Sequence, residues 1–170
     1  MPKTSRAPAV SCHPDDAELL RKWQADWRIF IRQALRLNLD PDQEAIVQSV
    51  QHNPRTVVRS GHARGKDYVA AACSLAFLYL NHPSKVINTA PTHRQVAAIM
   101  LAEARKMWRN ALFPLGGRFL SNGLFFEDPD WFLLGFRARD RDIESWTGFH
   151  SPNIMVTVTE ASGIEDETMN

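Results

Sequence analysis

The sequence predicts an α/β fold in which a mostly parallel central sheet is flanked by helices and preceded by a helical N-terminal segment. Short β-branched, apolar runs alternate with longer stretches in which apolar residues recur every three or four positions. Of the 170 residues, 44% are hydrophobic and 23% are charged, as in globular domains. The length fits one domain that can bury a sizeable core.

Charge and cysteine content exclude several classes of protein. The chain has 20 Lys+Arg and 19 Asp+Glu, a formal net charge of +1, so a basic surface could only be local. Its cysteines, Cys12 and Cys73, form no CxxC or Cys/His pattern, which indicates a reducing compartment without structural zinc. No stretch approaches a membrane span and the N-terminus lacks a signal-peptide core, so we expect a cytoplasmic protein without membrane contact.

The first part of the chain is expected to be helical. Residues 1–13 have the composition of a mobile tail. Apolar spacing predicts a helix over 15–37, whose opposite face carries arginines that could contact phosphates but more often form a solvated surface. A shorter helix follows over 42–51. We therefore divide the chain into the tail, N-terminal helices over 14–52, and a core over 53–170.

The core is expected to begin with a buried strand, because residues 55–59 are a β-branched run. A helix that is apolar on nearly all sides follows, which indicates burial against a sheet. Aromatic residues and turn signals later in the chain predict one or two hairpins. The expected order is strand 55–59, helix 66–80, strand 85–89, helix 92–111, hairpins within 114–139 and strand 153–159.

The junction between the first strand and its helix has the composition of a phosphate-binding loop. Gly65 and Lys66 occupy the Gly-Lys positions of G-x-x-x-x-G-K-[ST], in which backbone N–H groups and the lysine hold phosphates. Ser60 stands where the first glycine belongs, and Asp67 stands where a hydroxyl should hold Mg²⁺. An ordinary strand-to-helix turn is the alternative. The candidate phosphate-binding residues are Ser60, Gly61, His62, Ala63, Arg64, Gly65, Lys66 and Asp67.

The last predicted strand ends at residues whose side chains could act together with this phosphate-binding loop. Glu160 directly follows the apolar run, where a glutamate can orient or deprotonate an attacking water. Thr159 occupies the preceding position, at which an aspartate usually helps to hold Mg²⁺. Glu160 could instead be an exposed residue at the end of a strand.

Several segments, taken in order, resemble the N-terminal ATPase part of the terminase large subunit of tailed phages and prophages. They are residues 27–31, 39–43, 60–66, 89–96, 146–150 and 158–163. The resemblance covers roughly residues 20 to 165. It implies a P-loop NTPase fold and an ATP hydrolase that uses Mg²⁺ to drive double-stranded DNA into a procapsid. It also implies an adenine contact from Gln43, and a core that is incomplete at its C-terminal end.

The resemblance further implies catalytic roles for Lys66, Glu160 and an arginine, for which Arg64 is the favoured candidate. Arg59, Arg139 and Arg141 are the alternatives. The implied partners are double-stranded DNA, the portal protein, the small terminase subunit and further copies in a ring, all in the bacterial host cytoplasm.

Asp67 and Thr159 depart from the family pattern, and two interpretations stay open. The carboxylate and the hydroxyl beside the metal could have exchanged places between the loop and the strand, so that Asp67 and Thr159 are the metal ligands. Both changes could instead mark decay to a nucleotide-binding module without efficient hydrolysis. A helicase-like ATPase is a third possibility, although no DExD/H motif is present.

Overall fold

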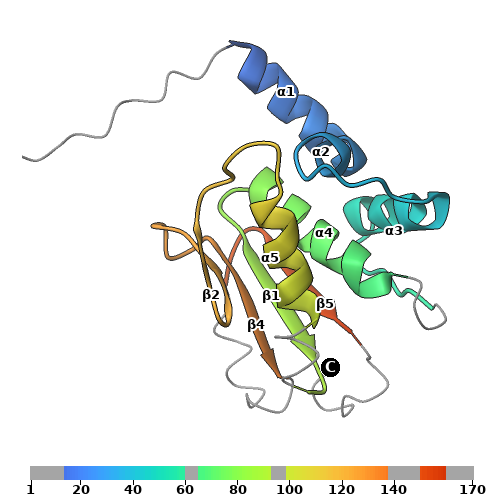
Figure 1. Ribbon diagram of the computed structural model, residues 1–170, viewed down its shortest axis with the longest axis vertical. Helices are drawn as coiled ribbons and strands as arrows, with labels where there is room; N and C mark the ends of the chain where they lie inside the picture. Colours follow the sequence, from blue (N-terminus) through green and yellow to red (C-terminus); the bar gives the residue numbers. More distant parts are fainter. Residues whose placement is uncertain (1–13, 60–64, 93–98, 138–149, 160–170) are drawn as a thin grey trace, which may run out of the picture.

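In the part of the chain that the structure describes, a five-stranded mixed sheet forms the centre of the molecule (Figure 1). The computed structural model describes residues 14–59, 65–92, 99–137 and 150–159. The strand order is β2-β3-β4-β1-β5. The strands are β1 (Lys85–Ala90), β2 (Arg118–Leu120), β3 (Gly123–Phe125), β4 (Phe132–Arg137) and β5 (Ile154–Val158).

Strand β1 is central and lies parallel to both of its neighbours, β4 and β5. The pairs β2–β3 and β3–β4 are antiparallel. The predicted strands 85–89 and 153–159 and the hairpins within 114–139 are thus confirmed, but the expectation of a mostly parallel sheet is wrong. Short turns such as the one at Ser121 and Asn122 reverse the chain at once, which leaves no room for the crossover that parallel strands need.

Within the described ranges, five helices accompany the sheet, and α4 lies at the centre of the packing. They are α1 (Pro14–Ala25), α2 (Trp27–Gln33), α3 (Pro41–His52), α4 (Lys66–Leu80) and α5 (Leu101–Arg109). Helix α4 contacts β1, β4 and β5 on one side and α1, α2, α3 and α5 on others (Figure 1). Its side chains Leu75 and Leu78 are fully buried. The bounds predicted for this helix are confirmed, as is its burial against the sheet.

The predicted helix over 15–37 is divided at Asp26. This residue has an extended backbone (φ −147°, ψ 105°), and its side chain accepts a hydrogen bond from the backbone N–H of Arg28. Asp26 therefore caps α2 and separates it from α1, because a side chain that satisfies a free N–H group favours a new helix start. Within the predicted helix 92–111, the structure defines α5 over Leu101–Arg109, and residues 93–98 lie outside the described ranges.

The strand predicted over 55–59 is not formed. Its apolar side chains face solvent, with Val57 88% and Val58 39% exposed. A β-branched run becomes a strand only where a neighbouring strand offers hydrogen bonds and burial, and among the described residues this run pairs with no strand. The segment is instead tied to α3 by a 3.0 Å hydrogen bond between the Ser49 and Thr56 hydroxyls.

No helix within the described ranges is long and apolar enough to cross a membrane.

Candidate functional site

The carboxyl ends of the three parallel strands meet at one edge of the sheet. In β1, Thr89 is in register with Phe136 of β4 and Val158 of β5. Thr159 continues from β5 and its N–H donates to the Thr89 carbonyl at 3.1 Å. Helix α4 precedes β1 and packs back on the sheet, so the helix starts at this same edge. Such an edge is where open α/β sheets bind their ligands.

The starts of α3 and α4 lie side by side, where Gln43 in the first turn of α3 is next to Gly65, the residue before α4. A Cβ atom placed on Gly65 would lie 2.9 Å from Nε2 of Gln43. Gln43 is fixed by a capping box, in which its N–H donates to the Asp40 carboxylate at 2.9 Å and its Oε1 accepts from the Asp40 N–H at 3.2 Å. The structure therefore brings together two of the predicted site residues that are far apart in sequence.

Gly65 has a left-handed backbone, with φ +73°, and caps α4 without a side-chain hydrogen bond. Glycine adopts this conformation at little cost, whereas other residues are strained there. Lys66 and Asp67 are the first two residues of α4. The positive end of the helix and the Lys66 ammonium thus belong to the same turn, an arrangement that favours anions.

Tyr68 and Glu103 add a feature that the motifs did not single out. Burial raises the pKa of Tyr68, and the nearby Glu103 carboxylate raises it further. Glu103 lies in the first turn of α5, so its negative charge faces the start of α4. The sequence assigns Glu103 only to the predicted helix 92–111, because the pattern of a single chain does not show which helix will lie opposite.

Thr159 is nearly buried, with 8% of its surface exposed. Its hydroxyl donates to Sδ of Met100 at 3.4 Å, which connects the end of β5 to the residue before α5. Thr159 and Asp67 therefore lie at the same edge of the sheet but on different elements. Among the described residues, no group of three or more His, Cys, Asp or Glu side chains is arranged to hold a metal ion.

Part of the predicted site lies outside the described residues. This applies to Glu160, to Arg139 and Arg141, and to the loop residues Ser60, Gly61, His62, Ala63 and Arg64. The predicted residues within the described ranges are Gln43, Gly65, Lys66, Asp67 and Thr159, together with Arg59, the exposed alternative to Arg64.

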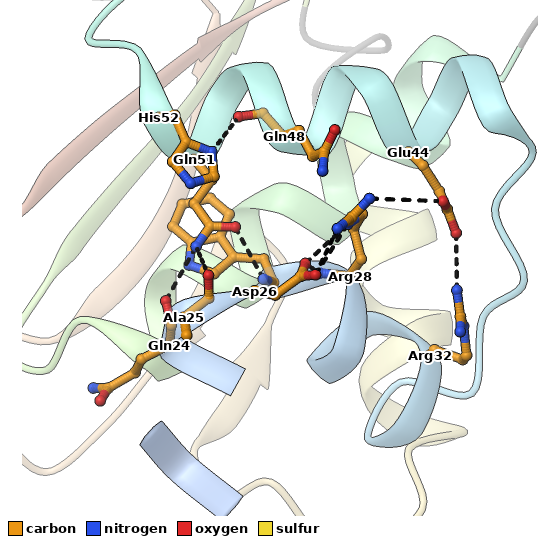
Figure 2. Close-up of polar contacts among 10 residues, drawn as sticks. Gln24, Ala25, Asp26, Arg28, Arg32, Glu44, Gln48, Gln51 and His52 are labelled. Carbon is orange, nitrogen blue, oxygen red and sulfur yellow. Dashed lines mark hydrogen bonds and ion pairs between the residues drawn. The ribbon is translucent and has the colours of Figure 1, made fainter. Parts of the chain in front are cut away.

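Two arginines of α2, Arg28 and Arg32, are engaged in intramolecular ion pairs (Figure 2). Arg28 contacts Asp26 at 2.7 Å and Glu44 at 4.0 Å, and Arg32 contacts Glu44 at 2.9 Å. The hydrogen bond from Arg28 holds the pKa of Asp26 below its usual value. These cations join α2 to α3, so they are poorly placed for the phosphate contact considered for this helix.

Comparison with known proteins identifies a phage relative. No protein-family model matches the chain. The chain is 26% identical over 172 aligned residues to a protein of Enterobacteria phage P7 described as "Probable terminase, large subunit". The alignment covers 95% of this chain and 35% of the phage protein, so the chain spans about a third of the length of that relative. The chain is thus similar to a phage terminase large subunit along nearly all its residues, which confirms the resemblance that its motifs indicated.

Proposed function

We propose that this chain is the nucleotide-binding part of a phage DNA-packaging motor, which hydrolyses ATP to move double-stranded DNA into a procapsid. The similarity to a terminase large subunit over 95% of the chain carries this proposal. The contact between Gln43 and Gly65 supports it, because the residues proposed to meet adenine and phosphate lie together at the sheet edge. The portal protein, the small terminase subunit and further copies of the chain are the proposed partners.

Each predicted site residue has a proposed role in binding or hydrolysing ATP. Gln43 would contact the base, while the backbone around Gly65 and the Lys66 ammonium would hold the phosphates. Asp67 and Thr159 offer a carboxylate and a hydroxyl oxygen, which are the donor types that Mg²⁺ prefers. When bound, Mg²⁺ would neutralise charge that develops on the transferred phosphate. Glu160 is proposed to position the attacking water, and Arg64 to stabilise negative charge.

The central test compares Lys66→Ala with Lys22→Ala. Lys22 is an exposed lysine paired with Glu18 at 2.7 Å on α1, so its replacement removes the same charge away from the proposed site. Mg²⁺-dependent phosphate release and binding of a fluorescent ATP analogue are measured for each variant. We expect Lys66→Ala to lower hydrolysis by at least about tenfold, since this lysine contacts the β- and γ-phosphates. Equal activity of the two variants would contradict the proposal.

A second test addresses the exchange of carboxylate and hydroxyl between the loop and β5. We compare Asp67→Thr, Thr159→Asp and the double variant for Mg²⁺-dependent hydrolysis. If the groups act beside one metal, the double variant restores activity that each single variant loses. A double variant no better than the worse single variant would refute the exchange.

A binding module without hydrolysis is the second candidate function. Two observations favour it: the strand expected before the phosphate loop is not formed, and the Thr159 hydroxyl is already bonded to Met100. ATP binding without phosphate release, both with and without DNA, would identify this case.

A further inference from the structure

The outward face of α5 is a basic groove, which we define by Arg105, Lys106 and Arg109. These side chains, with Ala102 and Asn110, line a shallow depression of about 480 Å³. Arg109 comes three positions after Lys106 and four after Arg105, so it neighbours both on one side of the helix, while the opposite side of α5 carries the buried residues Leu101, Ala104 and Met107.

The cations of the groove differ in their surroundings from Lys22 and Arg32 of the N-terminal helices. Within the described ranges, Lys106 and Arg109 have no carboxylate at ion-pair distance. Lys22 and Arg32 of the N-terminal helices are paired with glutamates. Because the chain as a whole carries a net charge of only +1, this concentration of uncompensated charge is a local feature that favours an anionic ligand.

Arg105 is held in place before any ligand arrives. One of its terminal nitrogens donates to the Leu120 carbonyl of β2, and its guanidinium carbon lies 4.8 Å from the centre of the Phe119 ring. A guanidinium has five N–H donors, so others remain for a ligand. An arginine fixed by stacking loses less conformational entropy when it binds than a free side chain does.

We propose that this basic groove binds the phosphodiester backbone of double-stranded DNA. The ligand class rests on the proposed packaging function, and the location rests on the groove itself. Arg105 and Arg109 are separated by four residues, about 6 Å along the helix axis, so the cations can meet successive phosphates. The groove lining contains no aromatic ring, whereas sites for single strands stack bases on aromatic side chains.

The groove also shares a helix with the candidate nucleotide site. Helix α5 begins after Met100, which accepts the hydrogen bond from Thr159, and Glu103 of its first turn faces Tyr68. DNA in the groove would therefore be held by the same helix that contacts the carboxyl edge of the sheet.

The test compares two double variants of the 170-residue chain that remove equal charge. Lys106→Gln/Arg109→Gln removes two cations of the groove, and Lys22→Gln/Arg32→Gln removes two cations already paired with glutamates. Binding of a fluorescent blunt duplex is measured by anisotropy over a series of salt concentrations, and thermal melting confirms that both variants fold. Arg105 is left intact because it also packs on Phe119.

We expect the groove variant to lose affinity for the duplex by on the order of ten- to a hundredfold at low salt. The affinity of the control variant should stay near that of the wild type. The slope of log K against log salt should fall by about 1.8, at about 0.9 for each phosphate contact removed. Equal affinity of the two variants, or an equal loss for a single strand of the same length, would overturn the inference.

Binding of a fluorescent ATP analogue to the same preparations separates this inference from the proposed function. Groove-dependent DNA binding supports the inference whether or not the analogue binds. Analogue binding without groove-dependent DNA binding overturns the inference and leaves the nucleotide site standing.

Discussion

Replacing Gly65 by alanine should destabilise the chain and disturb the candidate nucleotide site. A left-handed backbone costs a residue with a Cβ about 1–2 kcal/mol, and the new Cβ would lie 2.9 Å from Nε2 of Gln43. If Gln43 moves away, its hydrogen bond with the Asp40 N–H is also at risk, which is worth about 1 kcal/mol. Alanine offsets part of this by about 0.4–1 kcal/mol through the unfolded chain. We therefore expect a net loss of about 1–2 kcal/mol in the free energy of unfolding.

Urea unfolding followed by circular dichroism measures this loss, and Gly116→Ala is the matched control. Gly116 has nearly the same backbone, φ +76°, but a Cβ there would meet nothing within 4 Å. The control therefore reports backbone strain alone, and the excess cost of Gly65→Ala reports the contact with Gln43. That excess should shrink when Gln43→Ala is added. Equal costs for the two glycine variants would refute the placement of Gln43 against Gly65.

Two further predictions concern titratable groups away from that site. Because the hydrogen bond from Arg28 lowers the pKa of Asp26 from its usual 3.8, the wild type should be more stable than Asp26→Asn at neutral pH. This advantage should disappear as the pH falls below about 4, through the lowered pKa of Asp26. Urea unfolding of both proteins at several pH values measures it. A difference in the free energy of unfolding that stays constant with pH would contradict the prediction. Burial raises the pKa of the Cys73 thiol to about 12, so in a Cys12→Ser chain iodoacetamide at pH 8 should label Cys73 only after urea is added. Labelling of the folded chain at the unfolded rate would show that the thiol is accessible.

Local sequence signals predicted those elements whose burial follows from their own composition. The helix 66–80 is apolar on nearly all sides, so it had to be buried, and its observed bounds are those predicted. The strands 85–89 and 153–159 are apolar runs long enough to pair, and they became β1 and β5. The turn signals after Pro114 likewise predicted the hairpins, because their geometry depends on a few neighbouring residues.

The failures occurred where the outcome depends on distant neighbours. The run 55–59 has a strand's composition, but within the described residues no strand lies beside it, so Val57 remains exposed. The break at Asp26 depended on its side chain capping α2 rather than continuing the helix. The apolar periodicity of 15–37 could not distinguish one helix from two that share a buried face.

The sequence by itself determined which residues can form helices and strands, the phosphate-loop composition at Gly65 and Lys66, and the terminase resemblance. Each of these is a property of residue order within a short stretch. Only the tertiary structure decided which distant residues share a site. It placed Gln43 against Gly65, tied Thr159 to Met100, paired Arg28 and Arg32 with carboxylates, and left the cations of α5 without carboxylate partners among the described residues. The physical reason is that contacts between elements depend on how their buried faces pack, and no local pattern records that arrangement.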